Sequence, residues 1–150
     1  MDWDILLIGG HSTSGKSTVA QHLGRRFGIP VTQVDDLRML LQRATKPGQI
    51  EGLHHFQQPE DRLFLRSPES LVEDHVRIAT IMSHALEVVI AHHVFVKQPI
   101  IIEGDGILPS LAKTEVIDGL AVAGRIHSVF VIGKTYQTFE DACRMRWPGE

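Results

Sequence analysis

The stretch GGHSTSGKST, residues 9 to 18, gathers three glycines, one lysine and five hydroxyl side chains. Within it, Gly10, Gly15, Lys16 and Ser17 fit the pattern G-x-x-x-x-G-K-[ST] without a mismatch. Glycines allow positive φ angles and a close approach of the backbone to a bound group. Consecutive backbone N–H groups at the start of a helix form an anion site. The stretch therefore predicts a loop that binds the phosphates of a nucleotide.

Two side chains of this loop have individual roles in the prediction. The Lys16 ammonium would reach the β- and γ-phosphates, and the Ser17 hydroxyl would bind Mg²⁺, which prefers oxygen ligands. The predicted nucleotide contacts are Gly10, His11, Ser12, Thr13, Ser14, Gly15, Lys16, Ser17 and Thr18.

A second candidate lies in QVDDLR, where Asp35 ends a predicted strand over residues 30–35. Ligands of open parallel sheets bind beyond the carboxyl ends of the strands, so Asp35 is expected on the same edge as Lys16. Its carboxylate would accept the proton of an attacking hydroxyl. Arg38, three residues on, would share that helix face and neutralise phosphate charge. We expect Asp36 to cap the following helix and Asp35 to be free, the alternative being that Asp35 caps it.

The third candidate is Glu103 in PIIIEGDG, at the end of another apolar run. We expect it at the same sheet edge, where it would join the Mg²⁺ shell directly or through water. Asp105 is an alternative for this role. The competing interpretation is simple turn chemistry between Gly104 and Gly106.

Basic residues mark two further segments. Between Ala44 and Ser67 the chain holds Lys46, His54, His55, Arg62 and Arg66, of which His54, Arg62 and Arg66 are our candidates for binding an anionic substrate. A solvated loop is the equally weighted alternative. In the segment 134–150, Arg144 and Arg146 are candidates for an arginine that stabilises the transition state, with Arg144 as our choice.

The elements that must position these residues alternate along the chain. Apolar runs predict strands at 5–8, 30–35, 100–106 and 128–133, and periodic patterns predict helices at 15–27, 36–44 and 68–95. Ser67 is the expected N-cap of the long helix, with Val72 and Val76 among its inward positions. A further helix is expected between the last two strands, because parallel strands need crossover connections. The prediction is a parallel α/β sheet covered by helices on both faces.

Composition excludes several classes of protein. A net charge of −3 argues against sequence-independent binding of nucleic acid. The single cysteine cannot form an internal disulfide, which favours a cytoplasmic location. The apolar run near the N-terminus is too short for a signal peptide or membrane span, so no membrane partner is expected.

Four segments together carry a family resemblance: LLIGGHSTSGKSTVAQHLGRRFGI, VDDLRMLL, LHHF and IIIEGDGILP. They resemble the 2-phosphoglycerate kinase group of small-molecule P-loop kinases, over roughly residues 4 to 133. The resemblance implies a three-layer, nucleoside-kinase-like P-loop NTPase fold, with ATP and Mg²⁺ as cofactors and a small hydroxyl compound as acceptor. It also implies family-like roles for Lys16, Ser17, Asp35, Arg38 and Glu103. It does not fix the substrate.

The sequence thus predicts one P-loop kinase-like domain over 1–150, with an acceptor-covering segment at about 36–98 and a lid at about 134–150. The fifth strand that such kinases usually carry is expected to be absent. A truncated chain, a natural minimal form and completion by a second copy in a homodimer are three interpretations. The predicted function is ATP- and Mg-dependent transfer of a γ-phosphoryl group to a hydroxyl of a small, anionic metabolite. The alternatives are a regulatory nucleotide-binding module without transfer activity and a nucleic-acid end kinase, which the acidic balance disfavours.

Overall fold

A four-stranded parallel sheet forms the centre of the computed structural model, which describes residues 2–55, 67–133 and 135–146. Its strands are β1 (Ile5–Gly9), β2 (Val31–Gln33), β3 (Ile100–Glu103) and β6 (Ile126–Phe130), in the order β2-β3-β1-β6. Ile5 pairs with Ile100 on one side and with Ile126 on the other. All four strands run the same way, so their carboxyl ends share one edge.

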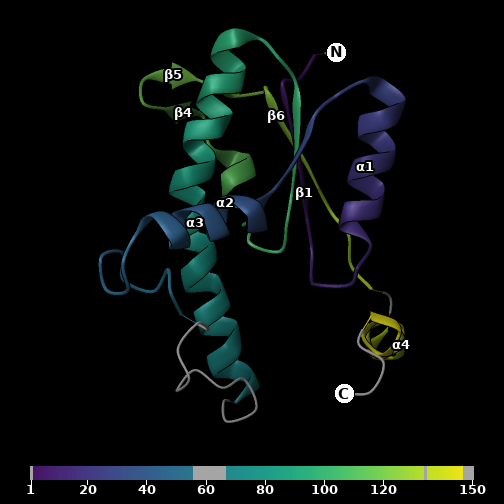
Figure 1. The fold of residues 1–150 in the computed structure, drawn as a ribbon. Helices are drawn as coiled ribbons and strands as arrows, with labels where there is room; N and C mark the ends of the chain where they lie inside the picture. Colours follow the sequence, from purple (N-terminus) through teal and green to yellow (C-terminus); the bar gives the residue numbers. More distant parts are fainter. Residues whose placement is uncertain (1, 56–66, 134, 147–150) are drawn as a thin grey trace.

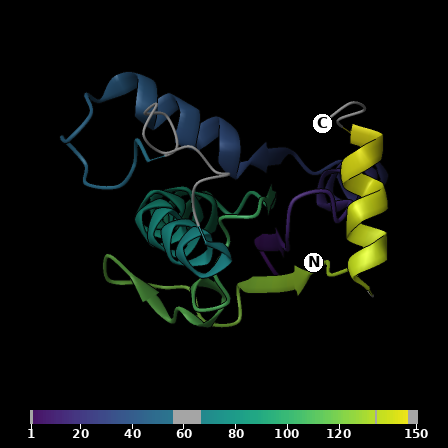
Figure 2. The same cartoon turned by 90° about the horizontal axis from the view of Figure 1, so that it is seen from below.

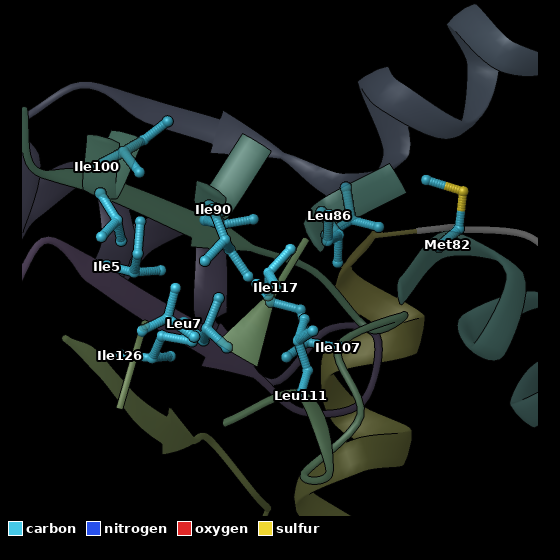
Figure 3. Close-up of a cluster of buried hydrophobic side chains, with 14 of the residues drawn as sticks. Ile5, Leu7, Met82, Leu86, Ile90, Ile100, Ile107, Leu111, Ile117 and Ile126 are labelled. Atoms are coloured by element: carbon cyan, nitrogen blue, oxygen red, sulfur yellow. The ribbon is translucent and has the colours of Figure 1, made fainter. Parts of the chain in front are cut away.

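The two faces of the sheet are covered by different helices, as Figures 1 and 2 show. The side chains of successive strand residues alternate between the faces. Ile5 and Leu7 of β1 join the larger core, to which α3 (Pro68–Val96) contributes Met82, Leu86 and Ile90 (Figure 3). On the other face, Ile8 and Ile101 pack with Ala20 of α1 (Lys16–Phe27). Because both faces are buried, β1 and β3 are wholly apolar until their last residues.

Helix α3 is the longest element, and its start follows the expected capping chemistry. The Ser67 side chain accepts a hydrogen bond from the Ser70 N–H, and Pro68 opens the first turn. A backbone hydrogen bond to the Glu69 carboxylate, and then the Ser67 hydroxyl, lower the pKa of Glu69. The helix is long and apolar enough to cross a membrane by length and composition. Here it is a core helix, with Ile78, Met82, Leu86, Ile90 and Val94 buried.

Part of the expected inward stripe of α3 is wrong. Val72 is 63% exposed and Val76 is 47% exposed. Figure 1 shows the reason: the first turns of α3 extend past the carboxyl edge of the sheet, where no strand lies beneath them. Among the apolar residues of the helix, burial therefore begins at Ile78, although the polar Asp74 is buried one turn earlier.

The connection between β3 and β6 also differs from the expected helix. It holds a 3₁₀ turn, η3 (Leu111–Lys113), and a small hairpin formed by β4 (Val116–Ile117) and β5 (Leu120–Ala121). Leu111, Ile117 and Val122 are buried in the same core as α3, so this hairpin takes the packing role that a helix would have. The last strand lies at 126–130 rather than 128–133.

The second strand is shorter than predicted. It ends at Gln33, and α2 (Val34–Ala44) begins at once, so the expected strand end at Asp35 and helix start at Asp36 are wrong. At this junction Gly104 lies against Val34, and a Cβ on Gly104 would be 2.6 Å from the Val34 Cβ. After β6 the chain forms α4 (Tyr136–Arg146), which in Figures 1 and 2 lies near the start of α1.

Candidate active site

A cavity of about 420 Å³ opens at the carboxyl edge of the sheet, where the strands meet the first turns of α1 and α2. Its lining divides into three parts. The loop wall is Ser12, Thr13, Gly15, Lys16, Ser17 and Thr18, the edge wall is Gln33, Asp35, Glu103, Gly104 and Asp105, and α4 adds Ala142 and Met145. The cavity thus brings together the predicted residues Lys16, Ser17, Asp35 and Glu103 from three separate segments.

The loop wall owes its shape to backbone angles that few residues adopt. Gly10, Thr13 and Gly15 have φ angles of 134°, 66° and 91°. A Cβ on Gly10 would lie 2.1 Å from the Val131 carbonyl oxygen, so only glycine fits there. Gly15 is the N-cap of α1 and offers no side chain to the first turn. The backbone N–H groups of that turn are therefore left for another acceptor, which is the physical requirement for anion binding.

Lys16 supplies the positive charge of the loop wall. The residue is only 7% exposed, and its ammonium Nζ donates a hydrogen bond to the His11 carbonyl oxygen over 2.7 Å. In the described part of the chain, no carboxylate lies within ion-pair distance of this ammonium. A buried ammonium held by one neutral carbonyl is poised to exchange that partner for a more negative one.

Glu103 is the most buried carboxylate at the cavity, with 3% of the residue exposed. Among the described residues, none donates a hydrogen bond to its side chain and none forms an ion pair with it. An ionised carboxylate without a partner is costly to bury. Glu103 and Ser17 line the same cavity, so this carboxylate is placed where a bound cation could pair with it.

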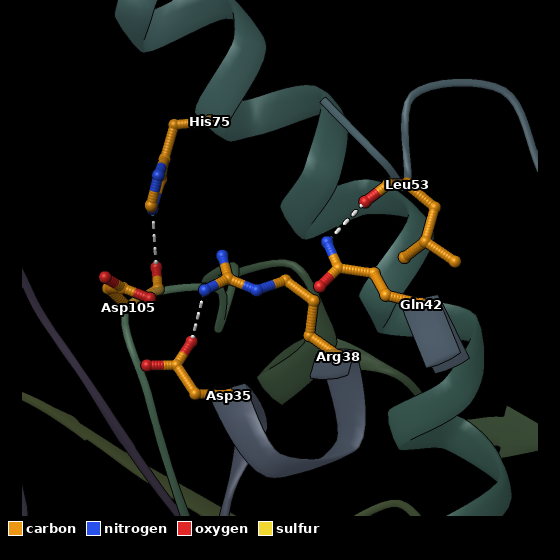
Figure 4. A network of polar contacts seen from close by, with 6 residues as sticks. All are labelled: Asp35, Arg38, Gln42, Leu53, His75 and Asp105. Carbon is orange, nitrogen blue, oxygen red and sulfur yellow. Dashed lines mark hydrogen bonds and ion pairs between the residues drawn. The ribbon is translucent and has the colours of Figure 1, made fainter. Parts of the chain in front are cut away.

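Asp35 lies in the first turn of α2, still at the predicted edge of the sheet. It is not free: its Oδ1 lies 2.9 Å from the Arg38 Nη2, as Figure 4 shows. The side chain is about half exposed, so the pair is open to solvent and to ligands. Asp36 does not cap α2, because the N-cap residue is Gln33 and no side chain caps the helix. The predicted common face of Asp35 and Arg38 is confirmed.

Two polar contacts behind the edge wall were not predicted from the sequence. The His75 Nε2 of α3 lies 3.2 Å from the Asp105 carbonyl oxygen, and the Gln42 amide donates to the Leu53 carbonyl over 2.7 Å (Figure 4). Asp74, which is 5% exposed, pairs with His55 at 3.0 Å. The sequence offered one signal for these residues, namely polar side chains within an apolar helix pattern, but nothing named their partners.

Of the basic residues predicted to bind substrate or transition state, some lie among the described residues and others outside them. His54 is buried away from the cavity lining, with its Nε2 3.0 Å from the Thr45 hydroxyl at the end of α2. Arg62 and Arg66 lie outside the described residues. Arg144 is exposed on α4 and pairs with Glu140 at 2.6 Å, whereas Ala142 and Met145 of the same helix line the cavity. The structure thus places α4 at the site but not the Arg144 guanidinium.

Comparisons with known proteins bear on the fold alone. No protein-family model matches the chain, and no curated protein matches it. A sugar kinase from Janibacter sp. HTCC2649 aligns over 99% of this chain and 69% of its own, with a TM-score of 0.56 and 13% identity. A gluconokinase from Sinorhizobium meliloti 1021 aligns over 99% and 67%, with a TM-score of 0.48 and 14% identity. The chain has the P-loop kinase-like fold predicted from its sequence. The comparisons give no support to the 2-phosphoglycerate kinase group in particular.

Proposed function

We propose that this chain is a kinase that transfers the γ-phosphoryl group of ATP, in a Mg²⁺-dependent reaction, to a hydroxyl group of a small metabolite. One observation carries the proposal. One cavity is lined by Lys16, whose ammonium has no acidic partner among the described residues, and by the first turn of α1. The same cavity is lined by a solvent-open carboxylate, Asp35, and a buried one, Glu103. Phosphoryl transfer needs these groups, because it depends on positioning and on charge stabilisation.

The loop wall is proposed to hold the nucleotide. The backbone N–H groups of residues 15–18 would donate to the β- and γ-phosphate oxygens, and Lys16 would leave the His11 carbonyl for them. The predicted contacts with Gly10, His11 and Ser14 are proposed through the backbone, since these residues do not line the cavity with the others.

The residues present fit a magnesium ion bound with the phosphates. Ser17 and Glu103 offer oxygen ligands across the same cavity. The described chain holds no cluster of three histidine, cysteine or acidic side chains that would hold a metal alone. Magnesium does not need such a cluster, because it is usually held by one or two protein oxygens together with substrate phosphates and water. The bound ion would neutralise charge on the phosphates.

Asp35 is proposed as the base on the acceptor side. The acceptor oxygen forms a bond to the γ-phosphorus while the bond from that phosphorus to the β–γ bridging oxygen breaks. The hydroxyl proton passes to the Asp35 carboxylate, and ADP leaves. Arg38, held on Asp35 at 2.9 Å, keeps the carboxylate at the cavity mouth and brings a positive charge near the transferred group.

An anionic acceptor and a cytoplasmic location remain part of the proposal. The proposal that the acceptor is anionic depends on Arg38 and on the basic residues of the segment 45–66. His54 is no longer among them, because its ring is bonded to Thr45. We expect Arg62→Ala and Arg66→Ala to raise the KM for the acceptor while the KM for ATP stays unchanged. An unchanged acceptor KM in both variants would remove the basic segment from the proposal.

The direct test has two steps. Calorimetry with Mg-ATP measures binding, and coupled ADP release over a panel of phosphorylated acids, carboxylated sugars, neutral sugars and nucleosides measures transfer. Mg-ATP binding together with turnover on one acceptor class supports the proposal. A folded wild-type protein that does not bind Mg-ATP would refute it, and binding without turnover on the whole panel would favour the regulatory module.

A further inference from the structure

We infer that His11 is a positioning residue that joins the glycine-rich loop to the segment leading into α4. The inference rests on the proposed function, because it concerns how the same cavity is assembled. It assigns to the His11 ring a role distinct from phosphate contact. The ring accepts a hydrogen bond from Gly133, which lies outside the cavity lining. This bond would fix the position of α4 relative to the loop wall.

The backbone around His11 explains why a side chain is needed here. The pairing of β1 with β6 continues past Phe130, where the Val131 N–H donates to the Gly9 carbonyl over 2.8 Å. Gly10 then turns away from the sheet with a φ of 134°, against the Val131 carbonyl. β1 ends at Gly9, and the Gly133 N–H, two residues beyond Val131, donates to the His11 Nε2 over 3.1 Å.

The second ring nitrogen fixes the form of the imidazole. Because the Gly133 N–H donates to Nε2, Nε2 carries a lone pair, and the proton lies on Nδ1. Nδ1 is 2.6 Å from the Ser12 carbonyl oxygen, to which it donates. The neighbouring His11 carbonyl accepts from the Lys16 ammonium. The ring and backbone of one residue therefore contact the loop, the lysine and the connection to α4.

The connection matters because α4 borders the cavity. Ala142 and Met145 line it, and the Cys143 sulfur lies 4.0 Å from the Thr13 hydroxyl oxygen of the loop wall. The segment from Val131 to Gly133 leads from β6 into this helix. When His11 holds Gly133, the start of α4 is tied to the loop that is proposed to carry the phosphates. A ligand that orders the loop then also orders α4.

Three variants separate the acceptor nitrogen from the bulk of the ring. His11→Gln places an amide group near the position of Nε2, whereas His11→Asn places one near Nδ1 and leaves the Gly133 N–H without its acceptor. His11→Ala removes both. We expect His11→Gln to resemble the wild type and His11→Asn to resemble His11→Ala. His84→Asn is the matched control, because that ring also bonds a backbone carbonyl but lies exposed on α3.

Two measurements test the contact between His11 and Gly133 and do not require enzymatic activity. Hydrogen exchange at the Gly133 amide should rise by about tenfold in His11→Asn and His11→Ala, the change that one lost neutral hydrogen bond produces. Cys143 is the only cysteine of the chain, so its reactivity with an aromatic disulfide reagent reports on α4. We expect faster labelling in the same two variants. We also expect Mg-ATP to protect Cys143 in the wild type and in His11→Gln, but less in His11→Asn.

Equal exchange at Gly133 and equal labelling of Cys143 in the wild type and His11→Asn would overturn the inference. So would equal losses in His11→Gln and His11→Asn, because the ring would then act by packing and not as an acceptor. A wild type that fails to bind Mg-ATP would refute the proposed function instead. The exchange and labelling rates measured without nucleotide would still decide the role of His11.

Discussion

The loop wall and the edge wall of the cavity are built in opposite ways. The loop wall comes from six residues within the single stretch 12–18, whose shape follows from local φ angles and the start of α1. The edge wall joins Gln33 and Asp35 with Glu103, Gly104 and Asp105, which are about seventy positions apart in the printed sequence. It is supported from behind by His75 of α3, through the Asp105 carbonyl.

Because the two walls are built differently, substitutions in each should affect different steps of the proposed reaction. Changes in the loop wall alter charge and backbone shape at one point, and their effects should fall on proposed nucleotide binding and on the charge of the transferred phosphate. Changes in the edge wall alter how separate elements meet, and their effects should fall on the acceptor and on the transfer step. Substitutions that affect one wall and spare the other test whether the two functions are in fact separate.

The largest effect is expected from Asp35→Asn. The amide keeps the size of the side chain but cannot accept a proton, so acceptor phosphorylation should fall by roughly a hundredfold to ten-thousandfold. Calorimetry should show Mg-ATP affinity near that of the wild type, because the loop wall is unchanged. Asp36→Asn is the control, since that neighbour is exposed and absent from the cavity lining.

An equal loss of ATP affinity and of turnover in Asp35→Asn would move Asp35 into the magnesium shell. It would also show that the edge wall contributes to nucleotide binding together with the loop wall. A pH–rate profile sharpens the test, because a base role predicts that the acidic limb of the wild-type profile is lost in the variant.

Lys16→Ala should produce the next largest effect, from the other wall. Removal of one electrostatic partner of the transferred phosphate typically costs about a hundredfold in rate. Because the His11 carbonyl is the one partner of this ammonium among the described residues, the melting temperature should change little. Mg-ATP affinity and ADP release measure the loss. Lys113→Ala is the control, because the Lys113 side chain on the 3₁₀ turn is exposed. A large fall in melting temperature with intact binding would contradict the assignment.

Gly10→Ala should affect stability before function. Its Cβ would lie 2.1 Å from the Val131 carbonyl oxygen at a φ of 134°, so overpacking and strain should together cost about 3 kcal/mol. Gly28→Ala is the matched variant, because Gly28 has a φ of 66° and open space around it. It should cost only about 1 kcal/mol, the price of the left-handed conformation. Equal values in urea denaturation would show that the close approach of β6 to the loop is unimportant.

The smallest effect is expected from Ser67→Ala, at the start of the helix behind the edge wall. Loss of the hydrogen bond from the Ser70 N–H should cost about 1 kcal/mol of unfolding free energy. Kinetic constants for ATP should not change, because Ser67 and the first turn of α3 do not line the cavity. A variant with unchanged stability would show that this cap contributes nothing to α3.

Local chemistry made the loop wall and the element types predictable. The pattern from Gly10 to Ser17 and the helix predicted at 15–27 are encoded within a few residues, and the structure confirms a helix at Lys16–Phe27. The buried runs of β1 and β3 and the long helix after Ser67 were predictable for the same reason. Even the shared face of Asp35 and Arg38 followed from helix periodicity.

Only the tertiary structure decided how the distant segments meet. Gly104 packs against Val34 where β2 passes into α2, and α3 extends beyond the sheet and leaves Val72 exposed. Likewise, His54 turns to Thr45, and His11 reaches Gly133 more than a hundred positions away. Sequence periodicity specifies which face of a helix or strand is apolar, since it depends only on residues close together in the sequence. It does not specify which neighbour fills that face, because partner choice depends on the packing of the whole chain.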